Sequence, residues 1–193
     1  MSIMRDLGPA ADAVTDVVNG ISPSDLASST PCGDYTVATL LEHVRGLSIA
    51  FADAAAKMAS PLTDNPPAPS GEDLPDDWAE QLPDRLQALA EAWRMPDAWL
   101  GFTRVGGVDL PGGIAGLVAL NELVVHGWDL AVATGQEYSL DDETLGGSLT
   151  LLYPPEPQSE REGVYGPVVE VPPDAPALDR VLGLAGRDPK WTP

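Results

Sequence analysis

The chain is poor in cysteine, histidine and basic residues. It has one cysteine, Cys32, two histidines, and ten basic residues of which only Lys57 and Lys190 are lysines. A single cysteine excludes an internal disulfide, which suits a reducing compartment. Thirty acidic residues give a formal net charge of -20. That charge repels phosphate groups, so we expect no nucleic acid and no anionic membrane as a partner.

Two further absences concern targeting. The first six residues, MSIMRD, contain no apolar core of a signal peptide, and together with the lone cysteine this predicts a cytoplasmic protein. Only residues 114–133 are apolar enough to resemble a membrane span, but they include Asn121, Glu122, His126 and Asp129, which are costly in lipid. We therefore interpret this segment as a buried core helix. The 193 residues and 44% apolar content predict a single domain over 1–193.

Hydrophobic periodicity predicts an all-α protein with a short β-hairpin and additional C-terminal helices. The hairpin is expected in Trp99–Pro111, where Gly106-Gly107 permits a tight turn. The proline-rich segment 60–75 should not pack as an element and would serve as a lid or a tether. Ser139 and Asp142 form a variant of the capping box. The expected helices are residues 3–19, 36–58 with Thr36 as N-cap, 76–93, 114–134, 139–152 and 177–184.

Glu122 and His126 form the most informative pair in the sequence. Residues four apart lie on the same side of a helix, and this helix is hydrophobic nearly all round. The other histidine, His43, falls at the edge of the apolar stripe of a second core helix and could supply a third ligand. Two imidazoles and one carboxylate suit Zn²⁺, Ni²⁺ or Fe²⁺, and three protein ligands leave a position open for water or substrate. Asp129 lies on the same side and would either orient His126 or bind the metal directly.

Simpler interpretations stand beside this one. Glu122 and His126 could pair with each other as a structural contact, with no metal. A metal- or ligand-binding bundle without catalysis would also fit the residues. Cys32 could take part in thiolate chemistry, or it could be a small buried apolar residue beside Pro31.

Several motifs together resemble a known family. They are TPCGDYTV at 30–37, LLEHV at 40–44, NELVVHGWDLA at 121–131 and TG at 134–135, with further similarity in YGPVV at 165–169 and GRDP at 186–189. These resemble DinB-like proteins and, more closely, the N-terminal domain group of mycothiol-dependent maleylpyruvate isomerases. The similarity extends over almost the whole chain.

The resemblance implies a four-helix bundle in up-down-down-up order with a divalent metal held by His43, Glu122 and His126. In the isomerase the metal is Zn²⁺ and the thiol is mycothiol, so the resemblance implies a thiol-dependent S-transferase or isomerase acting on a small electrophile. It also implies a homodimer. The isomerase has a separate C-terminal domain, whereas only residues 153–193 follow the fifth expected helix here. The substrate is therefore not carried over from the family.

Overall fold

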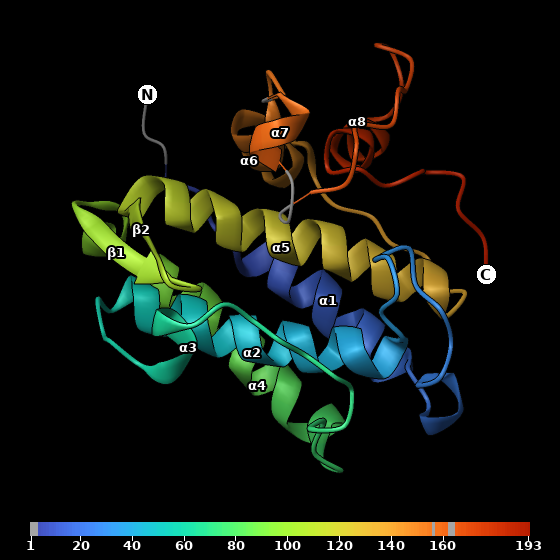
Figure 1. Ribbon diagram of the computed structural model, residues 1–193, viewed down its shortest axis with the longest axis horizontal. Helices are drawn as coiled ribbons and strands as arrows, with labels where there is room; N and C mark the ends of the chain where they lie inside the picture. The colour runs from blue at the N-terminus through green and yellow to red at the C-terminus, as the bar shows by residue number, and fades with distance from the viewer. Residues whose placement is uncertain (1–3, 156, 162–164) are drawn as a thin grey trace.

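The fold is mainly helical, with one small antiparallel sheet (Figure 1). The computed structural model describes residues 4–155, 157–161 and 165–193. The predicted fold class is confirmed, and most predicted helices lie within a few residues of their expected bounds. The elements are α1 (Gly8–Gly20), the 3-10 turn η1 (Pro23–Asp25), α2 (Val37–Ala55), α3 (Pro61–Asp64), α4 (Trp78–Trp93), the 3-10 turn η2 (Pro96–Trp99), β1 (Phe102–Val105), β2 (Val108–Pro111), α5 (Gly112–Ala133), α6 (Asp142–Leu152), α7 (Gln158–Arg161) and α8 (Ala177–Leu184).

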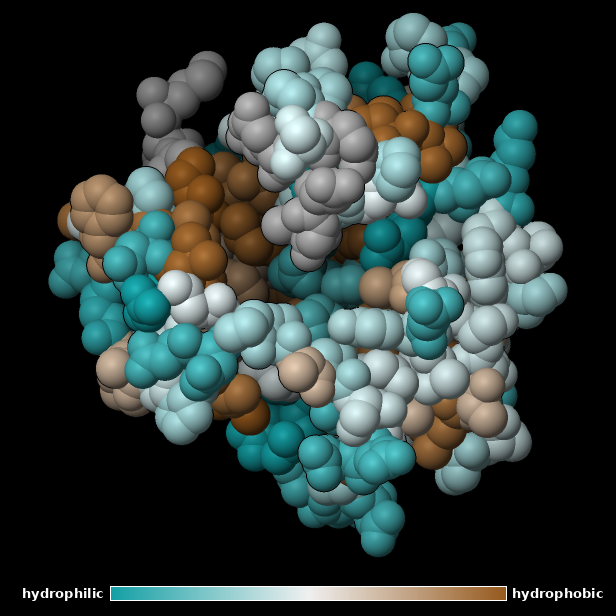
Figure 2. All heavy atoms as spheres, in the orientation of Figure 1, coloured by the Kyte–Doolittle hydropathy of each residue, from teal (hydrophilic) through white to brown (hydrophobic). Residues whose placement is uncertain are grey.

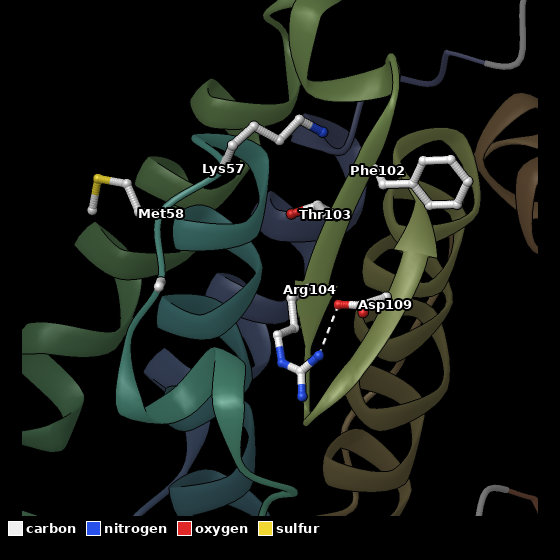
Figure 3. Close-up of a pocket in the computed structure, with 7 residues that line it drawn as sticks. Lys57, Met58, Phe102, Thr103, Arg104 and Asp109 are labelled. Carbon is white, nitrogen blue, oxygen red and sulfur yellow. Dashed lines mark hydrogen bonds and ion pairs between the residues drawn. The ribbon is translucent and has the colours of Figure 1, made fainter.

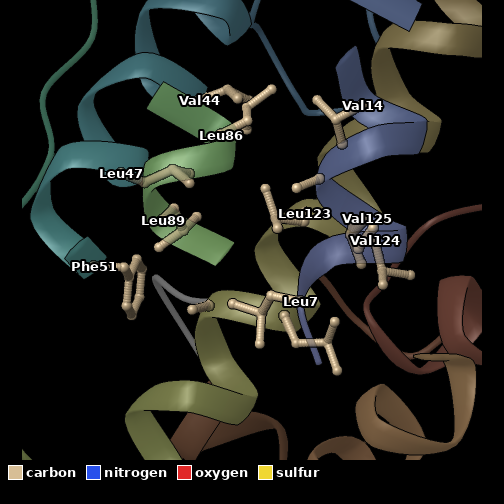
Figure 4. Packing of buried hydrophobic residues seen from close by; sticks show 14 of the residues in the cluster. Leu7, Val14, Val44, Leu47, Phe51, Leu86, Leu89, Leu123, Val124 and Val125 are labelled. Atoms are coloured by element: carbon tan, nitrogen blue, oxygen red, sulfur yellow. The ribbon is translucent and has the colours of Figure 1, made fainter. Parts of the chain in front are cut away.

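Helices α1, α2, α4 and α5 form the bundle. Both α1 and α2 pack against α4 and α5, so α1 lies diagonally across from α2. Apolar side chains from all four helices meet in the core, including Val14, Leu47, Leu89 and Leu123 (Figure 4). The burial of this shared cluster is the main force that holds the helices together.

Contacts between helix ends fix the direction of each helix. The C-terminal ends of α2 and α4 meet where the Trp93 indole donates a hydrogen bond to the Phe51 carbonyl, 3.1 Å away. Gly8 begins α1 beside Arg94, which follows α4. After α5, the Gln136 amide bonds to the carbonyl of Val17 near the end of α1, 3.0 Å away. Helices α1 and α5 therefore run together, opposite to α2 and α4, in the up-down-down-up order that the resemblance implies.

Helix α5 is the buried centre of the molecule. It is long and apolar enough to cross a membrane, but 83% of its most apolar window is buried inside the protein. This is the pattern of a core helix in a soluble protein, and a cytoplasmic location stays a prediction. Gly135 ends the helix with a φ of +68°, a conformation that glycine adopts without steric cost.

The hairpin forms as predicted. Strands β1 and β2 pair from Phe102 opposite Pro111 to Val105 opposite Val108. Gly106 and Gly107 both have positive φ, which matches the twist of a two-residue hairpin turn. The hairpin is held against the bundle, because the Thr103 hydroxyl donates to the Ala54 carbonyl at the end of α2, 2.6 Å away.

Two predictions of local structure are wrong. Segment 60–75 does contain an element, because Ser60 and Thr63 cap each other at the start of α3 and the Thr63 side chain is buried. The N-cap of α6 is Asp141, not Ser139, and its carboxylate accepts a hydrogen bond from the Thr144 backbone N–H, 2.7 Å away. In both places a hydrogen bond from a capping side chain sets where the helix begins.

The C-terminal segment packs onto the outside of α5. Helix α6 contacts α5 and also α8, so it connects the bundle to the end of the chain (Figure 1). The backbone of Val169 bonds to the Gly183 carbonyl, 2.9 Å away. The Arg187 side chain of this segment reaches Asp129 in the second half of α5, 3.0 Å away.

The surface is mostly hydrophilic on the face shown in Figure 2. Brown apolar areas gather on the left of this view, where the hairpin and the start of α5 lie (Figure 1). Phe102 on β1 and Val108 on β2 are 73% and 56% exposed.

Candidate metal centre

The structure brings the three predicted ligands together. His43 lies in the first half of α2, and Glu122 and His126 lie one turn apart on α5. Glu122 Oε2 is 3.0 Å from His126 Nε2 and 3.5 Å from His43 Nε2. The two imidazole rings meet edge to face, with their centroids 4.9 Å apart. Two helices that are distant in sequence thus present two nitrogens and one carboxylate to one point.

The spacing of these atoms fits a divalent metal. One ligand atom from each residue can be chosen so that all three lie within 4.8 Å of one another. Tetrahedral ligands at zinc distances lie roughly 3.3–3.4 Å apart, and the measured separations of 3.0 and 3.5 Å fall on either side of that value. Among the described residues, the buried Nδ1 atom of His43 has no hydrogen-bond partner. The residues therefore fit a metal, and their role as ligands stays a prediction.

The charges of the centre are strongly coupled. Burial alone would raise the pKa of the Glu122 carboxyl, but hydrogen bonds from His126 and His43 outweigh burial and hold that pKa below its ordinary value. Burial alone would lower the pKa of His126, yet its contacts with Asp129, Cys32 and Glu122 raise it well above its ordinary value. Without a metal, protonated His126 donates to the carboxylates of Asp129 and Glu122. A metal bound to His126 would have to replace one of its protons.

Asp129 fits the orienting role and not that of a direct ligand. Its Oδ2 lies 3.0 Å from His126 Nδ1, and since a carboxylate only accepts, the imidazole carries its proton on that nitrogen. Arg187 binds both oxygens of Asp129 with distances of 3.0–3.2 Å. The Asp129 side chain is completely buried, and its charge is already balanced by these partners.

Cys32 lies beside the centre. The loop that carries it is fixed by Thr30, whose hydroxyl donates to the Tyr35 carbonyl and accepts from the Cys32 backbone N–H. Ligand atoms of Cys32, His126 and Asp129 also lie within 4.8 Å of one another. Since Asp129 is held by Arg187, this second group is not an independent metal site. Cys32 is half-buried and packs against the apolar core, so both predicted interpretations of this thiol stay open.

The proline-rich segment is attached close to His43. The backbone N–H groups of Ser70 and Gly71 donate to the Glu42 carboxylate, with a shortest distance of 2.6 Å. Glu42 directly precedes His43, so this segment is anchored beside a predicted ligand. It forms a fixed contact there and is more than a tether between α2 and α4.

A separate hollow of about 250 Å³ lies beside the hairpin (Figure 3). Its lining includes Lys57, Thr103, Arg104 and Asp109 and none of the three predicted ligands. The Lys57 ammonium donates to the Ala98 carbonyl, 2.8 Å away, and Arg104 pairs with Asp109. The cations at this hollow are already engaged, so it offers no chemistry comparable to that of the centre.

Arg187 is the site residue that sequence reasoning missed. It acts on Asp129 across 58 positions of sequence, and no local spacing rule predicts such a contact. The only available signal was the GRDP motif, which entered the resemblance without a role. Tyr35 was missed in the same way, although its ring approaches the His43 ring with centroids 6.0 Å apart.

Comparison with known proteins identifies the relatives. Two proteins of Mycobacterium tuberculosis, Uncharacterized protein MT0763 (strain CDC 1551 / Oshkosh) and Uncharacterized protein Rv0738 (strain ATCC 25618 / H37Rv), are each 28% identical over 134 residues, which is 69% of this chain and 68% of theirs. No solved structure gives a significant match. The model of the mycothiol maleylpyruvate isomerase N-terminal domain matches residues 7–131, which include all three predicted ligands. The chain therefore belongs to the mycothiol maleylpyruvate isomerase N-terminal domain family, with the DinB-like fold that this implies.

Proposed function

We propose that this protein is a divalent-metal enzyme that uses a low-molecular-weight thiol of the mycothiol type on a small electrophile, as an S-transferase or isomerase. The observation that carries the proposal is the convergence of His43, Glu122 and His126 at one partly open point. Their side chains are 11%, 20% and 10% exposed. The three side chains are thus largely enclosed but not sealed from solvent. Membership of a family named for mycothiol supports the choice of thiol.

Each residue has a distinct part in this proposal. His43, Glu122 and His126 would hold the metal, with Zn²⁺ as the first candidate and Ni²⁺ or Fe²⁺ as alternatives. Bound there, the metal would keep a thiol in its deprotonated form near neutral pH. Asp129 accepts from Nδ1 of His126 and would leave Nε2 as the nitrogen that binds the metal. The Tyr35 ring packs at the edge of the His43 ring.

The alternative is a bundle that binds metal without catalysis. It would need a fourth protein ligand that closes the open position. Asp129 is held by Arg187, so Cys32 is the described donor near His126 that could close it. Binding of Co²⁺ distinguishes the two, because a cysteine ligand adds an intense sulfur-to-cobalt absorption that Cys32→Ser would remove.

The test starts with metal content. The full chain, purified without a histidine tag, should hold one divalent metal per chain. Glu122→Gln and His126→Ala should lose it. Glu143→Gln makes the same change at an exposed position of α6 and should keep it. A wild-type protein that takes up no metal, or variants that bind it as well as the wild type, would contradict the site.

The second stage tests the chemistry. Metal-loaded protein with mycothiol should consume at least one member of a panel of small electrophiles, such as unsaturated ketoacids, epoxides and alkyl halides. Consumption should stop when the thiol is omitted. If the protein holds its metal and a broad panel shows no turnover, the thiol-transfer proposal is wrong and the non-catalytic alternative stands.

A further inference from the structure

We infer that Arg187, in the C-terminal segment, positions His126 through Asp129, so that this segment completes the metal centre. The inference rests on the proposed function, because it concerns the same three ligands. It goes beyond the family match, which ends at residue 131. Arg187 acts as a positioning residue, since it contacts Asp129 and not the ligands themselves.

The contacts form a continuous chain from the C-terminal segment to the ligands. Arg187 Nε lies 3.0 Å from Asp129 Oδ1, and its Nη2 lies 3.0 Å from Oδ2. The same Oδ2 lies 3.0 Å from His126 Nδ1. On the far side of the ring, His126 Nε2 is 3.0 Å from Glu122 Oε2. Every link is within hydrogen-bond distance, and the side-chain exposure along it is 12% for Arg187 and zero for Asp129.

The backbone at the end of α8 delivers the guanidinium to this position. Gly186 adopts a φ of +80°, and the Arg187 N–H donates to the Leu182 carbonyl, 2.8 Å away. A side chain at Gly186 would meet the backbone of Gly166 at 2.7 Å. This tight turn is the C-terminal cap of α8, and it fixes the direction in which Arg187 leaves the helix.

The charges explain why an arginine is suited to this place. Asp129 is buried beside an imidazole, and an unpaired buried carboxylate would be strongly disfavoured. A bidentate arginine pairs with this carboxylate through both oxygens and holds its plane fixed. The carboxylate then accepts from Nδ1–H, and Nε2 keeps its lone pair for a metal. Without the guanidinium, the Asp129 carboxyl would be free to rotate, and the His126 ring would lose its fixed orientation.

The test compares two arginines that each pair with an aspartate. Arg104 pairs with Asp109 on the hairpin, 2.8 Å away, and lines a hollow that includes none of the three predicted ligands. Arg187→Gln should weaken Co²⁺ binding by about 10–100-fold and change the visible absorption of the bound ion. Arg187→Lys keeps the positive charge but loses the guanidinium that binds both oxygens of Asp129. Its Co²⁺ affinity should fall between those of Arg187→Gln and the wild type. Arg104→Gln, which removes the hairpin pair, should leave affinity and spectrum unchanged.

The measurements are Co²⁺ affinity by competition with a chromophoric chelator, the visible spectrum, and thermal melting of each metal-free variant. If Arg187→Gln does not fold, Asp129→Asn removes the other partner of the same ion pair, on α5, and should show a similar loss of affinity. Equal affinity and identical spectra in wild type, Arg187→Gln and Asp129→Asn would overturn the inference while the metal site stands. A wild-type protein that binds no Co²⁺ would overturn the proposed function itself.

Discussion

Gly127, between the predicted ligand His126 and Trp128, gives the sharpest test of how α5 is packed. A Cβ atom at Gly127 would lie 2.7 Å from Cζ of Tyr138 and 2.8 Å from Cγ2 of Val14. The Tyr138 hydroxyl reaches over this glycine to donate to the Leu123 carbonyl, 3.1 Å away. Gly127→Ala would therefore displace the tyrosine and overpack the interface between α1 and α5.

The expected loss follows from three contributions. Overpacking costs about 1–3 kcal/mol, and a lost hydrogen bond to a carbonyl costs about 1 kcal/mol. Replacing glycine by alanine inside a helix returns about 1 kcal/mol. The net destabilisation of Gly127→Ala is thus about 1–3 kcal/mol, which corresponds to a drop in melting temperature of about 2–12 °C for a chain of this size.

Gly46 on α2 is the matched control. It also lies inside a long helix, but a Cβ there meets no atom within 4 Å. Gly46→Ala should stabilise the protein by up to about 1 kcal/mol. Chemical denaturation of both variants measures the two free energies of unfolding. If Gly127→Ala were as stable as Gly46→Ala, the packing of Tyr138 over α5 would be refuted.

Three further predictions concern caps, the core and the metal. Asp141→Ala should destabilise by about 1 kcal/mol through loss of the α6 cap. Because the bond to the Thr144 N–H lowers the pKa of Asp141, this contribution is complete above the unfolded pKa and is lost as pH falls through the folded one, as denaturation at several pH values would show. Trp93→Phe should lose about 1–3 kcal/mol in denaturant unfolding, because the indole bond to the Phe51 carbonyl is lost and the smaller ring leaves space in the core. Metal at 100 times its dissociation constant should raise stability by about 2.7 kcal/mol, and a chelator should reverse the rise in melting temperature in wild type but have no effect on Glu122→Gln.

Short-range patterns in the sequence predicted the caps and turns that depend on neighbouring residues. Thr36 accepts the predicted cap bond from the Thr39 N–H, and Gly106-Gly107 makes the predicted turn. The convergence of His43 with Glu122 and His126 followed from placing polar side chains on two core helices. These features depend on helix period and turn geometry, which are properties of neighbouring residues.

Contacts between distant segments were beyond the reach of the same patterns. The pairing of Arg187 with Asp129 depends on how α8 docks, and the docking depends on the close approach of Gly166 and Gly186. Nothing in the spacing of either residue signals the other. The start of α3 was missed for a different reason, since the proline content of 60–75 concealed the Ser60 cap and the favourable position of Pro61 in the first turn.

The contacts of Asp129 bear on which residue could be a fourth ligand at the predicted metal centre. In the sequence it was equally a ligand or an orienting residue. In the structure Arg187 binds both of its oxygens and His126 shares one of them, so Asp129 could bind a metal only by leaving a buried guanidinium unpaired, which is costly. Among the described residues, Cys32 is then the donor near His126 that could complete the predicted three-ligand set. Whether its sulfur does so separates the proposed enzyme from the closed-site alternative.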